Sequence, residues 1–124
     1  MNWEDFINAI GKRESSNNYA AKNQFGYLGR FQFGKLRLCD LGLTDGKRWL
    51  FDLTDTKFLE NPKLQDAVFD THVAKHRKRI LKKYSEYLGA TVHDVELTLS
   101  GVIACFHLLG EGGFKKFLAS KEQS

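Results

Sequence analysis

A single proline marks the start of the longest helix that the sequence predicts. Pro62 is the only proline in the sequence, and Asn61 before it is a residue that caps helices. No glycine or further proline follows until Gly89, and apolar residues recur between them at helical spacing. The sequence therefore predicts one long helix over residues 62–88, against which the rest of the chain must pack.

The first half is also expected to be helical in part. The spacing of its apolar residues predicts a first helix that Asn2 caps, with Gly11 near its end and Glu14 at or just past its last turn. A short helix over residues 35–41 is ended by Gly42, because glycine commonly terminates helices. Residues 43–60 then form a connecting loop with at most a turn of helix.

The last third contains the most apolar segment. Residues 99–109 are apolar nearly all round, which is typical of a helix buried at the centre of a domain. Glycines then break this helix before a short last helix over residues 114–119.

In the first third of the chain, aromatic residues alternate with glycine and polar residues over residues 25–33, which suggests a small hairpin. The fold class is mainly α, and α+β at most.

Length and charge limit the function classes. The chain has 124 residues, enough for one domain over residues 1–124. Its net charge of +4 suits nucleic acid, an anionic membrane surface or an anionic polymer such as a cell wall.

No stretch approaches the ~20 apolar residues of a membrane span. The N-terminus lacks the basic start and apolar run of a secretory signal, so synthesis in the cytoplasm without a signal peptide is expected.

Several sequence motifs for phosphate binding, metal binding or serine hydrolysis are incomplete in this chain. Residues 29–35 have the spacing of a phosphate-binding P-loop, but Leu36 stands where a serine or threonine must bind magnesium. His72 and His76 are four residues apart, yet no third metal ligand is evident. No serine sits in a Gly-x-Ser-x-Gly elbow. The sequence therefore implies no metal ion and no organic cofactor.

Two further features have ordinary structural explanations. Residues 75–83 form the strongest basic cluster, which would suit nucleic acid or an anionic wall polymer. The exposed face of a long helix explains the cluster more simply, so nucleic acid is not the expected partner. Cys39 and Cys105 lie in apolar helical contexts, which favours small buried side chains, and whether they pair stays open.

Residues 10–34 hold the candidate catalytic group. Glu14 falls where the first helix ends, and polar small residues follow it. The chain then becomes dense in glycine and aromatics, with Tyr27, Phe31 and Gln32. A carboxylate at a helix end, faced by aromatics and amides, suits sugar chemistry. Glu14 is thus a candidate general acid/base, and a plain helix-end carboxylate beside basic neighbours is the alternative.

Three short blocks give these residues a context. They are Glu14-Ser15, Gly29-Arg-Phe-Gln32 and Ala104-Cys-Phe-His-Leu-Leu-Gly110. In order and spacing they resemble the lytic transglycosylase domain of the lysozyme-like superfamily, whose signature reads Glu-Ser, Gly-Leu-Met-Gln and Ala-Ala-Tyr-Asn-Ala-Gly. The third block is most similar to a phage- and secretion-associated branch that has Ala-Ala-His-Leu-x-Gly there.

The resemblance implies a compact lysozyme-like fold with helices around a substrate groove. It also implies how the enzyme would cleave its substrate. The glutamate that matches Glu14 would protonate the bond between N-acetylmuramic acid and N-acetylglucosamine. It would then draw a proton from the muramoyl 6-hydroxyl, which gives a 1,6-anhydro product without water. This role needs a carboxyl with a raised pKa, which partial burial against aromatic rings provides.

The resemblance also implies the residues that face the substrate. Ser15 would bond the glutamate or nearby backbone, and Gln32 would line the cleft. His107 stands where the family has an asparagine near the cleaved bond, and Phe106 replaces a tyrosine. Tyr19 and Tyr27 are cleft candidates because their hydroxyls need polar partners. The full set of expected substrate-binding residues is Ser15, Tyr19, Tyr27, Phe31, Gln32, Phe106 and His107.

Two alternative functions stay open. Ordinary glycosidases use two carboxylates, and no motif places a second one beside Glu14, although Asp40, Asp45, Asp52, Asp55 and Glu111 are present. This favours the one-carboxylate lyase over a muramidase that uses water. A non-catalytic wall-binding or structural module is the other alternative. The implied partners are peptidoglycan glycan strands and an immunity protein or a virion or secretion component. Phage lysis, a virion or a secretion system would deliver the chain to the periplasm and cell wall, where it would act.

Overall fold

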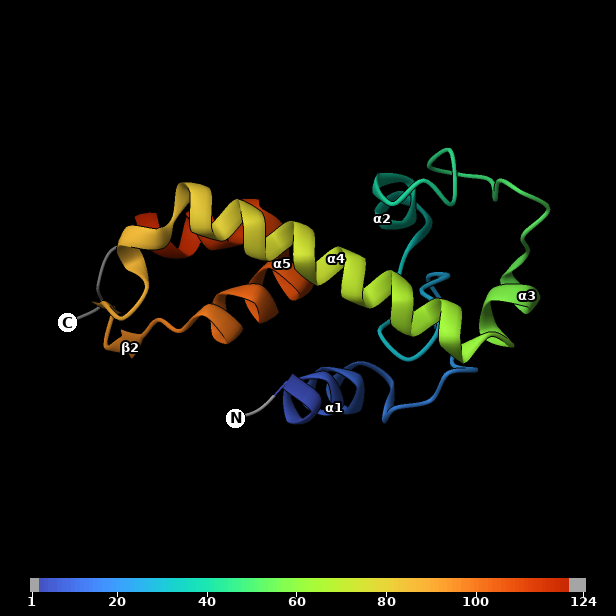
Figure 1. The fold of residues 1–124 in the computed structure, drawn as a ribbon, viewed down its shortest axis with the longest axis horizontal. Helices are drawn as coiled ribbons and strands as arrows, with labels where there is room; N and C mark the ends of the chain where they lie inside the picture. Colours follow the sequence, from blue (N-terminus) through green and yellow to red (C-terminus); the bar gives the residue numbers. More distant parts are fainter. Residues whose placement is uncertain (1–2, 121–124) are drawn as a thin grey trace. The chain divides into compact units, whose positions relative to one another are not determined.

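The fold is mainly helical with one small antiparallel hairpin, as predicted. The structure is a computed structural model and describes residues 3–120. The elements in chain order are α1 (Trp3–Ser15), α2 (Lys35–Asp40), α3 (Asp55–Leu59), α4 (Pro62–Lys83), a 3₁₀ helix (Ser85–Tyr87), β1 (Thr91–Val92), β2 (Val95–Glu96) and α5 (Leu99–Ala119) (Figure 1). The chain divides into two compact units, Met1–His72 and Val73–Ser124, with the division inside α4.

Local capping explains where the helices of the first unit begin and end. Asn61 accepts a hydrogen bond from the backbone N–H of Leu64 (3.0 Å), so α4 starts at Pro62 as predicted. Gly42 has a φ of +81°, a conformation that favours glycine, and lies just after α2. The predicted turn of helix in residues 43–60 is α3. Asn2, the predicted cap of α1, lies outside the described residues.

Aromatic rings form the core of the first unit. Phe31 stacks on Phe69 with ring centroids 3.8 Å apart, and Phe33 meets the buried ring of His72 edge-on at 5.4 Å. His72 is therefore a packed side chain. The buried hydrophobic residues of this unit are Phe6, Ile10, Leu28, Phe31, Phe33, Leu38, Phe58, Val68 and Phe69. They come from α1, α2, α3, α4 and the loop between α1 and α2.

The second unit has its own buried cluster. Tyr84, Phe106 and Phe114 pack with edge-on or tilted rings 5.2–5.9 Å apart. Gly110 has φ 73° and ψ 173° inside α5, so the helix is interrupted there, as predicted. The prediction that residues 99–109 are buried all round is wrong on one side, because Leu109 is 67% exposed.

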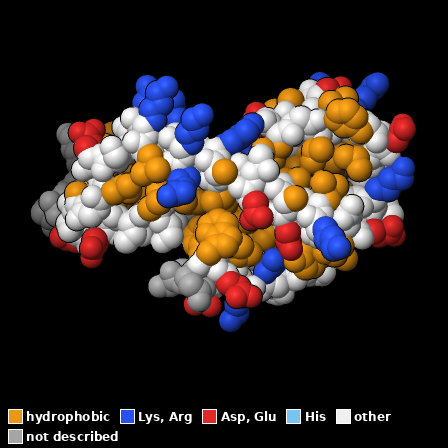
Figure 2. All heavy atoms as spheres, viewed as in Figure 1, with side chains coloured by type: hydrophobic (Ala, Val, Ile, Leu, Met, Phe, Trp, Pro, Cys, Tyr) orange, Lys and Arg blue, Asp and Glu red, His pale blue; other side chains and the backbone are white. Residues whose placement is uncertain are grey.

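Helix α4 is shorter than predicted, and the basic side chains of its C-terminal half are exposed to solvent. It ends at Lys83 rather than at residue 88, because Tyr84 leaves the helical region (φ −132°) and the 3₁₀ helix follows. Figure 2 shows several separate Lys and Arg side chains near the C-terminal half of α4. The residues concerned, Lys75, Arg77, Lys78, Arg79, Lys82 and Lys83, are all exposed. None of the helices within residues 3–120 is both long and apolar enough to cross a membrane.

The hairpin is not where the sequence suggested. In residues 25–33 the structure has isolated bridges, including Leu28 to Phe33, and no named strand. The sheet is instead β1 paired with β2, in the register Thr91 to Glu96 and Val92 to Val95. His93 and Asp94 connect the strands with φ values of 50° and 65°. Positive φ at both positions is the geometry of a tight two-residue hairpin turn.

Candidate active site around Glu14

Glu14 lies in the last turn of α1 and is half-buried. Burial raises the pKa of its carboxyl above the ordinary value of 4.5, and the nearby charge of Arg13 lowers it by less. Within residues 3–120, no side chain or backbone group forms a hydrogen bond or ion pair with this carboxylate. A carboxyl in these surroundings can hold a proton at higher pH than usual and take it back, which is the property of a general acid/base.

Ser15 joins the end of α1 to the loop that contains the second sequence block. Its hydroxyl donates to the backbone carbonyl of Arg30 (2.7 Å) and accepts from the backbone N–H of Asn18 (3.0 Å). A longer contact of 3.4 Å reaches the carbonyl of Gly11. The residue next to Glu14 is therefore fixed against residues 29–32, so the first two blocks of the resemblance meet in space.

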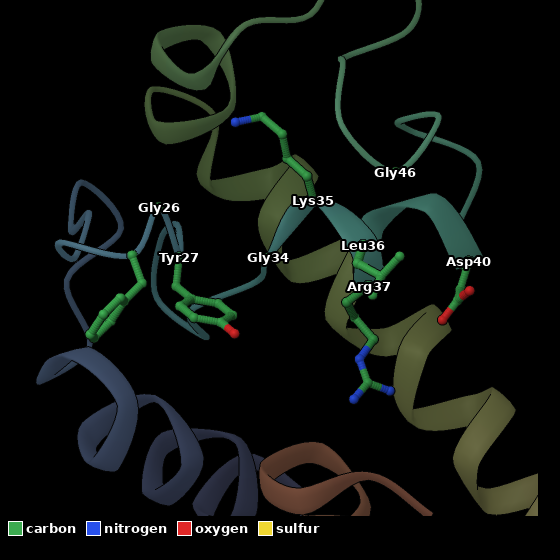
Figure 3. A pocket seen from close by; sticks show the side chains of 9 residues that line it. Gly26, Tyr27, Gly34, Lys35, Leu36, Arg37, Asp40 and Gly46 are labelled. Atoms are coloured by element: carbon green, nitrogen blue, oxygen red, sulfur yellow. The ribbon is translucent and has the colours of Figure 1, made fainter.

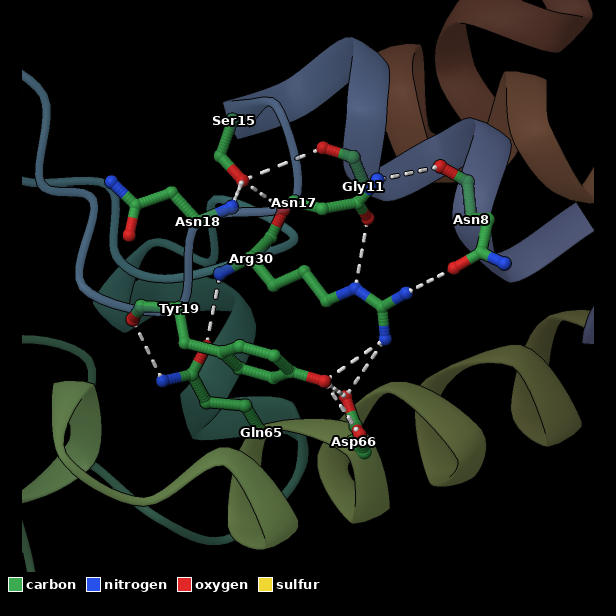
Figure 4. Close-up of polar contacts among 9 residues, drawn as sticks. All are labelled: Asn8, Gly11, Ser15, Asn17, Asn18, Tyr19, Arg30, Gln65 and Asp66. Atoms are coloured by element: carbon green, nitrogen blue, oxygen red, sulfur yellow. Dashed lines mark hydrogen bonds and ion pairs between the residues drawn. The ribbon is translucent and has the colours of Figure 1, made fainter.

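Arg30 is the centre of a polar network that sequence analysis did not identify (Figure 4). Its guanidinium donates to Asn8 (2.7 Å) and Asn17 (2.9 Å), which belong to α1 and the loop after it. It also donates to Tyr19 (3.1 Å) and forms an ion pair with Asp66 of α4 (3.3 Å). One side chain thus connects the end of α1, the following loop and α4.

Tyr19 uses its hydroxyl inside this network. The hydroxyl lies 2.9 and 3.0 Å from the two carboxylate oxygens of Asp66, to which it donates. Burial and the bond to Asp66 raise the pKa of Tyr19, with an opposing effect of the Arg30 charge. The polar partner expected for this hydroxyl is therefore the carboxylate of Asp66, a residue of the same chain.

Gln65 is the second residue that sequence analysis missed. Its side chain is 1% exposed and is fully hydrogen-bonded. The amide nitrogen donates to the carbonyls of Tyr19 (3.0 Å) and Phe58 (2.9 Å), and the amide oxygen accepts from the backbone N–H of Arg30 (2.9 Å). A polar residue on the buried face of an amphipathic helix is the signal that would have indicated it.

Gly29 allows this arrangement. Its φ is +81°, and a Cβ atom built there would collide with the amide oxygen of Gln65. Gln32, at the end of the same block, also has a positive φ of 54°. Its amide nitrogen donates to the carbonyl of Gly29 (2.9 Å), while its amide oxygen has no hydrogen-bond partner among residues 3–120. Gln32 thus braces the loop and keeps one acceptor available.

Two predicted substrate residues are almost completely buried. Phe31 and Phe106 are each 1% exposed. Phe31 stacks on Phe69, and Phe106 packs edge-on against His76 and Tyr84. Both rings belong to hydrophobic cores, so the expectation that they contact substrate is corrected. Phe106 and the half-buried His107 lie in the second unit.

Tyr27 lies at a surface pocket. The pocket has a volume of about 600 Å³ and is lined by Phe25, Gly26, Tyr27, Gly34, Lys35, Leu36, Arg37, Asp40 and Gly46 (Figure 3). Tyr27 is 45% exposed and packs closely on Gly34, where an added Cβ would lie 2.8 Å from the ring. Of the predicted substrate-binding residues, Tyr27 is the one that lines this pocket.

The other carboxylates considered as partners of Glu14 include three with structural roles. Glu111 accepts hydrogen bonds from Arg79 (2.9 and 3.1 Å) and from Tyr84 (2.6 Å), and these bonds lower its pKa. Asp45 accepts from the backbone within its own loop, which lowers its pKa. Asp55 accepts from the Trp49 indole (2.6 Å) and from lysines.

The structure also places the possible metal-ligating side chains and the two cysteines. No group of three or more histidine, cysteine, aspartate or glutamate side chains in residues 3–120 is arranged to hold a metal ion. Cys39 and Cys105 are both free and partly exposed, which differs from the small buried residues that the sequence favoured.

Comparisons of the sequence and structure with protein-family models, curated proteins and solved structures find no match. The resemblance to lytic transglycosylases therefore rests on the three sequence blocks alone.

Proposed function

We propose that this chain cleaves peptidoglycan glycan strands as a lytic transglycosylase, with Glu14 as the only catalytic acid and base. The observation that carries the proposal is the half-buried carboxylate of Glu14, whose pKa is raised and which no described residue neutralises. Its neighbour Ser15 is anchored to Arg30, so the backbone beside the carboxyl is held in place. Catalytic groups require this kind of supported position.

The proposed reaction has two steps on one carboxyl group. Glu14 first gives its proton to the oxygen that links N-acetylmuramic acid to N-acetylglucosamine, and the bond from that oxygen to the anomeric carbon breaks. The carboxylate of Glu14 then accepts the proton of the muramoyl 6-hydroxyl, whose oxygen bonds to the anomeric carbon. A raised pKa suits the first step, because the carboxyl must be protonated to act as an acid.

A second carboxylate is not required by this scheme. The ionised state of Asp45, Asp55 and Glu111 is stabilised by structural hydrogen bonds that lower the pKa of each. Carboxylates with a lowered pKa are poorly suited to donate a proton near neutral pH. Glu14 differs from these three in its raised pKa, which favours it as the acid.

The test is product analysis on purified peptidoglycan. Soluble fragments released by the protein are separated and weighed by mass spectrometry. We expect muropeptides that end in 1,6-anhydromuramic acid, one water lighter than hydrolysis products. Fragments with the added water would identify a muramidase instead. Sedimentation with the wall without any release would identify a binding module, and either result would overturn the lyase assignment.

A further inference from the structure

The pocket beside α2 has no part in the proposed proton transfers, since Glu14 is not among the residues that line it. Its volume of about 600 Å³ lies within the range of sites that enclose a small molecule or a short peptide. Its walls come from the loop before α2, from α2 itself and from the loop after it. The pocket is therefore built within the first unit.

Arg37 supplies an uncommitted positive charge to this pocket. Its guanidinium forms no ion pair or hydrogen bond with any side chain or backbone group in residues 3–120. The other cation of the pocket, Lys35, is already paired with Asp55 at 3.2 Å. Figure 3 shows Arg37 extending away from α2 into the open side of the pocket, toward which Tyr27 turns its hydroxyl. The planar guanidinium fork suits a carboxylate, which it can bind with two parallel hydrogen bonds.

Large apolar side chains surround this charge without being buried. Phe25 and Leu36 are each 76% exposed, and both line the pocket together with Tyr27. Figure 2 shows hydrophobic side chains gathered in the region of α2, α3 and the loop between them. Exposed apolar groups around a concave site favour a ligand with apolar groups of its own.

The acidic and basic side chains that line the pocket favour some anionic ligands over others. Asp40 lines the same pocket as Arg37. A carboxylate there lowers the positive potential, which disfavours a polyanion such as a chain of phosphates. One guanidinium within an apolar wall instead matches one bound carboxylate that lies next to small aliphatic side chains.

We propose that this pocket binds the carboxylate-bearing peptide that is attached to muramic acid in peptidoglycan. Arg37 holds one peptide carboxylate, and Phe25, Tyr27 and Leu36 pack against its aliphatic side chains. The assignment rests on the proposed function, because that function makes peptidoglycan the substrate. It adds a preference for glycan strands that still carry their peptides.

The test is a binding measurement that does not depend on turnover. Glu14→Gln protein is titrated by calorimetry with an N-acetylglucosamine–N-acetylmuramic acid disaccharide that carries the peptide, and with the same disaccharide without it. We expect the peptide-bearing ligand to bind about tenfold more tightly, as for a gained charge-assisted pair. Adding Arg37→Gln should remove this preference. Arg48→Gln, an equal charge change at an exposed position outside the pocket, should keep it.

The outcomes separate the two proposals. A preference for the peptide that depends on Arg37, in a wild-type protein that releases no fragments from the wall, would support the pocket and overturn the proposed activity. Wild-type release of anhydro products without any peptide preference would overturn the pocket alone. Binding of poly(glycerol phosphate) that depends on Arg37, with no preference for the peptide, would overturn the peptide assignment in favour of a phosphate polymer.

Discussion

The hydroxyl of Ser15 donates a hydrogen bond of 2.7 Å to the backbone carbonyl of Arg30, fifteen residues along the chain. This bond fixes the residue next to Glu14 against the loop that begins at Gly29. That loop is held from its other side by Gln65, which accepts the backbone N–H of Arg30. The candidate acid therefore lies at a helix end that Ser15 connects to this loop, and Gln65 in turn connects the loop to α4.

Ser15→Ala removes the first anchor. The backbone carbonyl of Arg30 and the N–H of Asn18 then lose a partner in a partly buried place, so we expect the free energy of unfolding to fall by about 1–2 kcal/mol. Urea unfolding measures this change. Ser85→Ala is the matched control, because Ser85 is exposed and its hydroxyl bonds to no described residue. Equal stability of the two variants would show that the bond contributes nothing.

Gly29→Ala tests the contact between the loop and α4. The added methyl group would be forced into the positive φ region and into the amide oxygen of Gln65. We expect a loss of about 3 kcal/mol from strain and overpacking together. Gly26→Ala separates the two effects, since Gly26 has a similar φ of +84° but open space around its Cβ position. A loss of about 1 kcal/mol is expected there, and a loss equal to that of Gly29→Ala would exclude the collision.

Asp55→Asn tests the ion-pair cluster near the pocket. Burial raises the pKa of Asp55, but hydrogen bonds from Trp49, Lys22 and Lys35 outweigh it and lower the pKa to about 2. A carboxyl with a lowered pKa stabilises the folded state above its unfolded pKa and loses this effect as pH falls toward its folded pKa. The variant should therefore be less stable than wild type at pH 7.

The stability difference caused by Asp55→Asn should shrink between pH 4 and pH 2, the window set by the ordinary value of 3.8 and the lowered value of about 2. Thermal unfolding across this range is the measurement. Asp52→Asn serves as control, because Asp52 is exposed and its side chain has no described partner. A difference that does not change with pH would contradict the assigned pKa.

Much of the helical framework follows from local signals in the sequence. Asn61 and Pro62 start α4, and Gly110 interrupts α5, because capping and positive φ are properties of single residues. The hairpin was misplaced for a related reason. Asn23 accepts backbone N–H groups of Phe25 and Tyr27, which turns the chain where alternation suggested a strand.

The anchors of the candidate site could not be predicted in the same way. Gln65 and Arg30 meet across 35 residues of sequence, and Arg30 reaches Asp66 across 36. Such pairs depend on tertiary packing, which no local pattern encodes. Phe31 was assigned to a cleft because aromatic rings suit sugars, but the same property makes a ring a good core residue, and it stacks on Phe69.

Glu14 should lower the stability of the fold at neutral pH. Its pKa is raised in the folded state, so the folded protein binds more protons than the unfolded chain above the ordinary value of 4.5. Stability then falls as pH rises through this window. Glu14→Gln should therefore be at least as stable as wild type at pH 7, with the advantage lost below about pH 4.5. Paired unfolding curves at pH 4 and pH 7 measure the difference, and a variant that is less stable only at pH 7 would contradict the raised pKa.

The most direct test of the central claim is the release of soluble fragments from purified peptidoglycan by Glu14→Gln and by Glu4→Gln. Both substitutions remove one carboxylate from α1, but Glu4 is exposed and lies in the first turn. Removing a general acid/base typically slows a reaction by about 10²–10⁴-fold. We predict that Glu14→Gln loses release by at least about 100-fold while Glu4→Gln keeps wild-type rates. Release by Glu14→Gln at the wild-type rate would contradict the assignment of Glu14.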